Sequence, residues 1–147
     1  MGNEIPELHG DNPSEAAIAD LLAGSRTIAV VGLSPKEHRD SNRVARYLIE
    51  QGYDVLPVNP GHEQILGRPC YRNVSAVPGK IDIVNCFIAS HRVPPVVDEA
   101  VALGVKALWM QIGVINEEAA ARARAAGIQV VMDRCTMVEH KKLMSAL

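Results

Sequence analysis

Residues 27–52 constrain the fold of this sequence more than any other segment. They begin with four apolar residues, 28–31, the pattern of a strand buried on both faces of a parallel sheet. Gly32 ends this run, and a polar loop follows. Apolar residues then recur at helical spacing until Gly52, which suits the left-handed position just past a helix. A strand followed by a loop and a helix places the free N–H groups of the helix start toward the loop. This arrangement predicts an anion-binding site.

Basic side chains gather where that helix is expected to begin. Lys36 lies in the loop, Arg39 just before the expected N-cap (Asp40 or Ser41), and Arg43 in the first turn. Cations at the positive end of a helix dipole are unfavourable by a few tenths of a kcal/mol each. A bound anion would remove this conflict, and the segment is therefore interpreted as the first half of a nucleotide-binding unit. The alternative is a solvated basic rim that nearby carboxylates partly neutralise.

The rest of the chain alternates strands and helices. A loose leader is expected at 1–11 and a helix at 12–24, with Asn12 as N-cap and Pro13 at the first helical position. Four more short apolar strands are expected within 54–61, 81–88, 105–113 and 128–133. Helices follow the last three of these strands. They open at Pro94 and Pro95, at Asn116, and at Thr136 and Glu139, which have capping-box spacing.

This alternation predicts one α/β domain over 27–147, with a Rossmann-like, doubly wound and mainly parallel five-stranded sheet and helices on both faces. In such sheets, ligands bind beyond the carboxyl ends of the strands, near the point where the strand order reverses. The segments expected at that edge combine Gly, Ser or Pro with polar or basic residues. The pattern therefore indicates a binding site there as well as a scaffold.

Composition limits the function further. The 147 residues carry a net charge of −2 and only 3% aromatic residues, which argues against binding of nucleic acid. No apolar stretch approaches the ~20 residues that span a bilayer, so no membrane partner is expected and the default location is the cytoplasm. Cys70, Cys86 and Cys135 are odd in number and widely spaced, so neither disulfides nor a metal site are predicted.

The nucleotide is not expected to be NAD. A dinucleotide site normally shows three spaced glycines after the first strand and an acidic residue at the end of the second. Here only Gly32 is present, and the second strand ends in Asn59. The basic loop suits a ligand with more phosphate charge. An NAD(H)-sensing domain on the same architecture stays as an alternative.

Four segments together resemble the small, single-domain coenzyme A-binding proteins, which are similar to the N-terminal domain of the succinyl-CoA synthetase alpha subunit. They read GLSPKEHRDSNRVARYL, VLPVNPG, ALWMQIGVINEEAAARARAAG and VVMDRC. The resemblance implies CoA or acyl-CoA as the ligand, bound at the carboxyl ends of the strands. The synthetase carries a Lys just after the second-strand turn, where this chain has His62. The phosphorylated His of the synthetases belongs to a further domain.

The resemblance also implies a set of binding residues. The CoA phosphates would contact Gly32, Leu33, Ser34, Lys36, Arg39, Ser41 and Arg43. The nucleotide would be flanked by Val58, Asn59 and Pro60, and the adenine would be bordered by Ala89, His91, Arg92 and Val93. The pantetheine arm would lie beside Gln111, Ile112 and Gly113. No catalytic residue is expected.

Two functions of different class follow. The first is a CoA-binding protein that is not an enzyme by itself, delivering or sensing its ligand for an unknown partner as a monomer or homodimer. The second is a stand-alone enzyme that uses CoA, with His91, His140 or Cys135 as the reactive group. A nucleophile needs a base within hydrogen-bond reach, and the spacing of these residues shows no such pair. The first function is therefore expected.

Overall fold

The computed structural model describes residues 11–147, so the leader expected at 1–11 lies, except for Asp11, outside the described residues. Five parallel strands form one sheet: β1 (Thr27–Val31), β2 (Asp54–Val58), β5 (Ile83–Cys86), β6 (Ala107–Met110) and β7 (Gln129–Met132). Their order is β2-β1-β5-β6-β7, so the chain winds one way from β1 to β2 and the other way from β5 to β7. The order reverses between β1 and β5. The predicted doubly wound sheet is confirmed.

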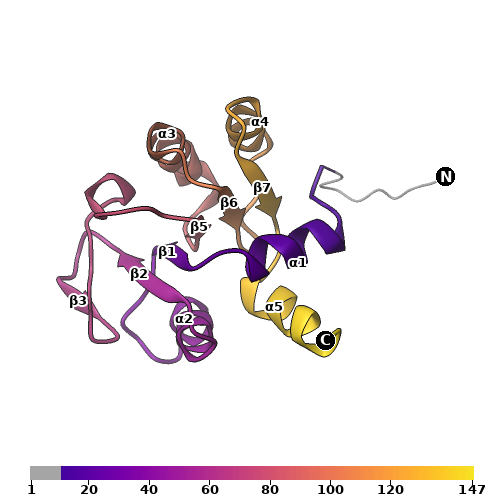
Figure 1. Cartoon of the computed structure of the whole chain (residues 1–147). Helices are drawn as coiled ribbons and strands as arrows, with labels where there is room; N and C mark the ends of the chain where they lie inside the picture. Colours follow the sequence, from indigo (N-terminus) through magenta and orange to yellow (C-terminus); the bar gives the residue numbers. More distant parts are fainter. Residues whose placement is uncertain (1–10) are drawn as a thin grey trace.

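Helices cover both faces of the sheet (Figure 1). Helices α3 (Val93–Leu103) and α4 (Glu117–Ala125) pack on one face, against Ala29 and Val31 of β1. Helices α1 (Glu15–Ala23), α2 (Asp40–Glu50) and α5 (Thr136–Ser145) pack on the other face, against Ile28 and Val30. Since successive strand residues point to opposite faces, the apolar run 28–31 serves both cores at once.

Two expected helix starts are confirmed. Asn116 is the N-cap of α4, and its side chain accepts a hydrogen bond from the Ala119 N–H at 3.0 Å. Helix α3 carries proline in its first turn, as expected, and ends at Gly104, which has φ +66°. A residue without a Cβ adopts this left-handed conformation at little cost.

The expected start of α1 is wrong. Ser14 is the N-cap, and its hydroxyl accepts from the Ala17 N–H at 3.1 Å. Asn12 instead binds the edge strand β7, because its side chain donates to the Met132 carbonyl at 2.9 Å and accepts from the Met132 N–H at 2.8 Å. The Asn12 side-chain amide thus pairs with both the N–H and the carbonyl of Met132 on the edge strand, as a neighbouring strand would.

The expected capping box at Thr136 and Glu139 is also wrong. Cys135 is the N-cap of α5 and makes no side-chain capping bond. Thr136 is fully buried, and its hydroxyl oxygen accepts from the side-chain amides of Asn85 and Gln111, both at 3.1 Å. The Gln111 amide also donates to Asn85 Oδ1 at 2.9 Å. The hydroxyl therefore joins β5, the end of β6 and α5 in one buried polar network.

The long polar connection after β2 contains elements that the sequence pattern did not show. A two-stranded antiparallel ribbon forms from β3 (Gln64–Ile65) and β4 (Arg68–Pro69), and a short 3-10 helix, η1 (Val74–Ala76), follows it. Between them Tyr71 forms an isolated parallel bridge with Val58 at the end of β2. A second 3-10 helix, η2 (Ser90–Arg92), leads into α3. Within residues 11–147, no helix combines the length and apolar character needed to cross a membrane.

Candidate functional site

Gly32 stands at the carboxyl end of β1, where the strand order reverses. Its φ is +84°, and a Cβ placed there would lie 2.4 Å from the Phe87 carbonyl oxygen and 2.9 Å from Ile88 Cγ2. Hydrogen bonds close this junction on both sides: the Gly32 N–H donates to the Val58 carbonyl and the Phe87 N–H to the Val31 carbonyl, each at 2.8 Å. Only glycine fits the turn and the close approach together.

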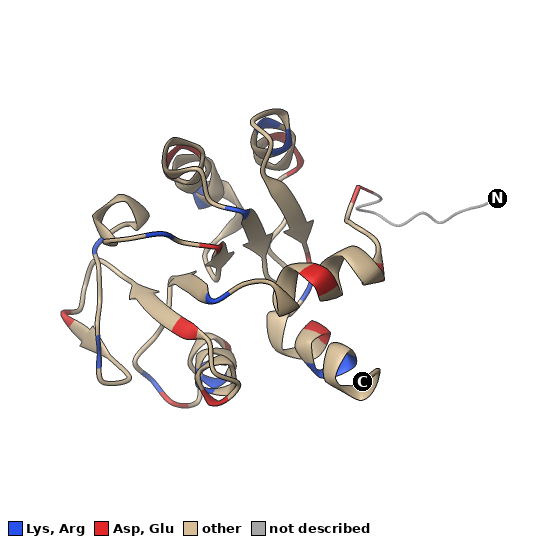
Figure 2. Ribbon diagram, in the orientation of Figure 1, with Lys and Arg blue, Asp and Glu red and all other residues tan. Residues whose placement is uncertain are grey.

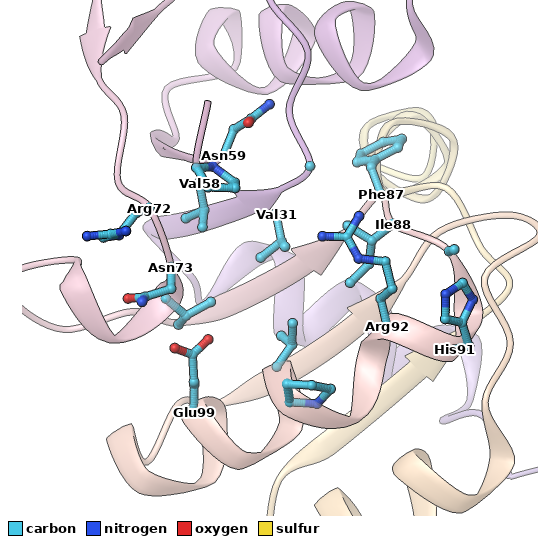
Figure 3. Close-up of a pocket in the computed structure, with 16 residues that line it drawn as sticks. Val31, Val58, Asn59, Arg72, Asn73, Phe87, Ile88, His91, Arg92 and Glu99 are labelled. Carbon is cyan, nitrogen blue, oxygen red and sulfur yellow. The ribbon is translucent and has the colours of Figure 1, made fainter. Parts of the chain in front are cut away.

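A cleft of about 680 Å³ opens at this junction, beyond the carboxyl ends of β1, β2 and β5 (Figure 3). We call it the β1–β2–β5 cleft. It is lined by Val31, Gly32, Val58, Asn59, Pro60, Arg72, Asn73, Val74, Phe87, Ile88, Ala89, His91, Arg92, Pro95, Val96 and Glu99. This volume lies within the range of ligand pockets, ~300–1,000 Å³. Its position is the one at which doubly wound sheets bind ligands.

The loop between β1 and α2 is fixed from beneath. The Ser34 N–H donates to the Ser41 hydroxyl at 3.0 Å, and the Asn42 amide donates to the Ser34 carbonyl at 2.8 Å. Arg46 donates to Asn42 Oδ1 at 2.8 Å and to the Glu37 carbonyl at 3.0 Å. Since Ser41 and Asn42 are buried, helix α2 itself holds the loop in place over its own N-terminus.

The N-terminus of α2 has no side-chain cap. The expected N-cap at Asp40 or Ser41 is wrong: the N-cap residue is Arg39, whose side chain makes no capping hydrogen bond to the first turn. The Asp40 and Ser41 side chains instead accept hydrogen bonds from Arg43 and from the Ser34 N–H. A second cavity of about 540 Å³, here called the α2 pocket, adjoins this end of the helix and is lined by Gly32, Ser34, His38, Arg39, Asp40, Ser41 and Phe87. Unsatisfied N–H groups and the helix dipole both favour an anion at this place.

The charged side chains around that N-terminus differ in how they are used. Figure 2 shows basic and acidic residues alternating in the loop that leads into α2. Arg43 is paired with Asp40 at 2.8 Å. Within residues 11–147, the side chains of Lys36 and Arg39 have neither an ionic nor a hydrogen-bonding partner. The basic rim is therefore only partly neutralised, and two cations remain for an external anion.

The structure brings most of the expected site residues to these two cavities. The β1–β2–β5 cleft takes Gly32, Val58, Asn59, Pro60, Ala89, His91 and Arg92, and the α2 pocket takes Gly32, Ser34, Arg39 and Ser41. Lys36 and Arg43 are exposed beside the α2 pocket without lining it, and Ile112 and Gly113 are exposed near the end of β6. Leu33, Val93 and Gln111 have their side chains in the protein interior. The binding roles themselves stay predictions.

Several cavity residues were missed by the sequence reasoning. Arg72, Asn73 and Glu99 line the cleft, Phe87 lines both cavities, and His38 lines the α2 pocket. His38 lies in the polar loop that follows Gly32, and Phe87 lies near the end of the strand expected within 81–88. Arg72 and Asn73 come from the polar connection after β2, which carries no periodic signal, and Glu99 from the middle of α3.

Within residues 11–147, no side-chain hydrogen bond joins any two of the residues considered for catalysis, His91, His140 and Cys135. His140 is buried between Tyr47 and Tyr53, with its Nδ1 2.7 Å from the Tyr47 hydroxyl, and burial lowers its pKa. His91 is exposed in the cleft, and Cys135 is 8% exposed at the start of α5. Burial raises the pKa of the Cys86 thiol to about 12. Among the described residues, no group of three His, Cys, Asp or Glu side chains is placed to hold a metal ion.

Fold and site together define a doubly wound α/β domain with a ligand cleft at its switch point, bordered by an uncapped helix N-terminus and unpaired cations. A family model described as a CoA binding domain matches residues 26–141 of this chain. The chain therefore belongs to the CoA-binding domain family, as the resemblance of its segments indicated.

Relatives agree with this assignment. The chain is 39% identical over 129 residues to the Bacillus subtilis protein YneT, covering 88% of this chain and 96% of YneT. A solved structure of a hypothetical protein from Pyrococcus horikoshii superposes with a TM-score of 0.91 at 40% identity, covering 97% of this chain and 99% of the other. An ADP-forming acetate–CoA ligase of Archaeoglobus fulgidus is 27% identical over 120 residues, which are 75% of this chain and 18% of the ligase. The chain thus corresponds to a small part of that ligase.

Proposed function

We propose that this protein binds CoA or acyl-CoA at the carboxyl edge of its sheet and is not an enzyme by itself. The observation that carries the proposal is the uncapped N-terminus of α2 with Lys36 and Arg39 unpaired beside it, in a chain of the CoA-binding domain family. The pyrophosphate of CoA is an anion of the kind such a helix end and such cations hold. The ligand's remaining parts would lie in the adjoining β1–β2–β5 cleft.

Calorimetry of CoA binding to alanine variants tests the anion-binding site. Replacing Lys36 or Arg39 is expected to weaken binding about tenfold to a hundredfold, because a charge-assisted hydrogen bond is lost. Arg43→Ala is expected to have a smaller effect, since Asp40 already engages this side chain.

Arg122→Ala is the matched control for lost charge, because Arg122 pairs with Asp98 at 2.6 Å between α4 and α3. It is expected to leave the affinity unchanged. Equal affinities in the wild type and in the Lys36 and Arg39 variants would remove the anion-binding site from the proposal.

A comparison with NAD tests the choice of nucleotide. Asn59 directly follows β2; its side-chain amide donates to the Leu33 carbonyl at 2.9 Å, and its Oδ1 accepts from the Gly61 N–H at 3.0 Å. Asn59 thus shapes the turn, and no carboxylate stands there to hold the ribose hydroxyls as in NAD sites. CoA is expected to raise the melting temperature more than NAD at equal concentration. The opposite order would favour an NAD(H) sensor.

The absence of catalysis is tested directly. General acid–base catalysis requires a base within hydrogen-bond reach of the group it serves. His140 is engaged with Tyr47, and neither His91 nor Cys135 has an acid or base hydrogen-bonded to its side chain within residues 11–147. Purified protein is expected to form no thioester from CoA, ATP or GTP and small carboxylates, and to hydrolyse no acyl-CoA. Turnover that survives repurification and is lost when one of these three residues is replaced would establish an enzyme.

A further inference from the structure

We infer that Arg72 and Arg92 in the β1–β2–β5 cleft bind a second phosphate group of the ligand, so that the protein selects CoA over CoA lacking its 3′-phosphate. The inference rests on the proposed function and adds the feature of CoA that is selected, with the residues that select it. It concerns a set of groups separate from the α2 N-terminus, Lys36 and Arg39.

Two guanidinium groups in the cleft are free to act on a ligand. Arg72 comes from the segment between β4 and η1, and Arg92 from η2 at the head of α3. Within residues 11–147, neither side chain has an ionic or hydrogen-bonding partner. In Figure 3 the Arg92 side chain extends over the cleft toward Val31, whereas Arg72 stands on the opposite side, beside Asn73, with its guanidinium group turned away from Arg92. Both residues are exposed, so the Arg72 side chain has room to turn toward a phosphate held at Arg92. The cleft's carboxylate, Glu99, is engaged instead by Ser75, whose hydroxyl and N–H donate to it at 3.0 and 3.4 Å.

The backbone on this side of the site offers little to an anion. Pro94 and Pro95 occupy the first turn of α3 and have no N–H to donate. Arg92 is the N-cap residue of that helix, and its side chain makes no capping bond. An anion in the cleft would therefore be held by guanidinium groups, which match the planar oxygen pairs of a phosphate better than an ammonium does.

The two clusters of basic side chains lie in adjoining but distinct cavities, the β1–β2–β5 cleft and the α2 pocket. Gly32 and Phe87 line both the cleft and the α2 pocket, whereas Arg72 and Arg92 line the cleft and Arg39 lines the α2 pocket. A ligand that spans both must carry anionic groups at two separated positions. CoA has this arrangement, with a pyrophosphate on one side of its ribose and a 3′-phosphate on the other. With the pyrophosphate at α2, the 3′-phosphate is the group left for the cleft.

The experiment is a thermodynamic cycle between residue and phosphate. Calorimetry measures CoA and 3′-dephospho-CoA binding to the wild type, to R72A/R92A and to the on-site control Lys36→Ala. The wild type is expected to prefer CoA by about tenfold to a hundredfold. R72A/R92A is expected to lose most of that preference by weakening CoA alone. Lys36→Ala is expected to weaken both ligands by the same factor and keep the preference.

The outcomes separate this inference from the proposed function. If the wild type binds the two ligands equally, or if R72A/R92A weakens both by the same factor, the cleft arginines do not read the 3′-phosphate and the inference falls while CoA binding stands. If the wild type binds neither ligand, both proposals fall. Circular dichroism of R72A/R92A confirms its fold, which should be retained because both side chains are exposed.

Discussion

Gly32→Ala tests whether the close approach of Gly32 to Phe87 and Ile88, just after β5, shapes the site. Two costs are expected at this position. A residue with a Cβ at φ +84° costs about 1–2 kcal/mol relative to glycine. The added Cβ would also lie 2.4 Å from the Phe87 carbonyl oxygen, well inside ordinary contact, and relieving such overpacking costs about a further 1–3 kcal/mol. The variant is therefore expected to lose about 2–5 kcal/mol of unfolding free energy.

Gly79→Ala is the matched control that separates the two costs. Gly79 has nearly the same φ, +82°, but nothing lies within 4 Å of the position that an added Cβ would take. It should therefore show the backbone cost alone. Urea unfolding measures the loss of unfolding free energy in each variant, and the two losses are compared provided that the free energy depends on urea concentration with the same slope in both. If Gly32→Ala is no more destabilising than Gly79→Ala, the junction yields easily and the close approach does not constrain the cleft.

Three further predictions concern titratable groups. Burial alone would raise the pKa of Asp82, but hydrogen bonds from the Arg26 and Thr27 N–H groups and the ammonium groups of nearby lysines outweigh burial and lower this pKa. The resulting stability is present above the unfolded-state pKa of the carboxyl and is lost as pH falls through the folded-state pKa. Asp82→Asn should therefore make the melting temperature depend less on pH in the acid range. Burial also lowers the pKa of His140, which gives stability above its unfolded-state pKa that is lost as pH falls below that value toward the folded-state pKa. His140→Gln should therefore lose less stability than the wild type as pH falls below about 6.5. Cys135, 8% exposed, should react slowly with a thiol reagent in the native protein, and rapid labelling that Cys135→Ser abolishes would contradict a structural role.

The elements that the sequence predicted are those whose signal is local. The run 28–31 and the other apolar strands formed as expected, because burial on both faces requires continuous apolar residues. Asn116 begins α4 and Gly104 ends α3 as expected, because a capping amide and a left-handed glycine act within one turn of the helix. The β3–β4 ribbon was missed since its turn uses Leu66 at φ +57°, where a side chain of that size is unusual and the pattern gives no warning.

The errors at two helix starts have a common physical cause. Asn12 and Thr136 are both good N-cap residues, and both form their hydrogen bonds far away in the sequence, with Met132 and Asn85. Capping signals describe a competition that local groups win only when no tertiary partner offers a better bond. The same reasoning explains why Arg72 was missed, since it reaches the site only through the fold of an irregular connection.

Gln111 shows how this limit applies to a site residue. By resemblance it belongs beside the pantetheine arm, and it does stand just past the carboxyl end of β6. Its side chain is only 3% exposed, however, and its amide donates to Asn85 and Thr136 inside the sheet's α5 face. Removing it would leave a buried acceptor on Asn85 without its donor, at a cost of about 1–3 kcal/mol. The side chain of Gln111 therefore acts first on the stability of the β6 end and of the start of α5, and through them on the edge where the ligand is proposed to bind.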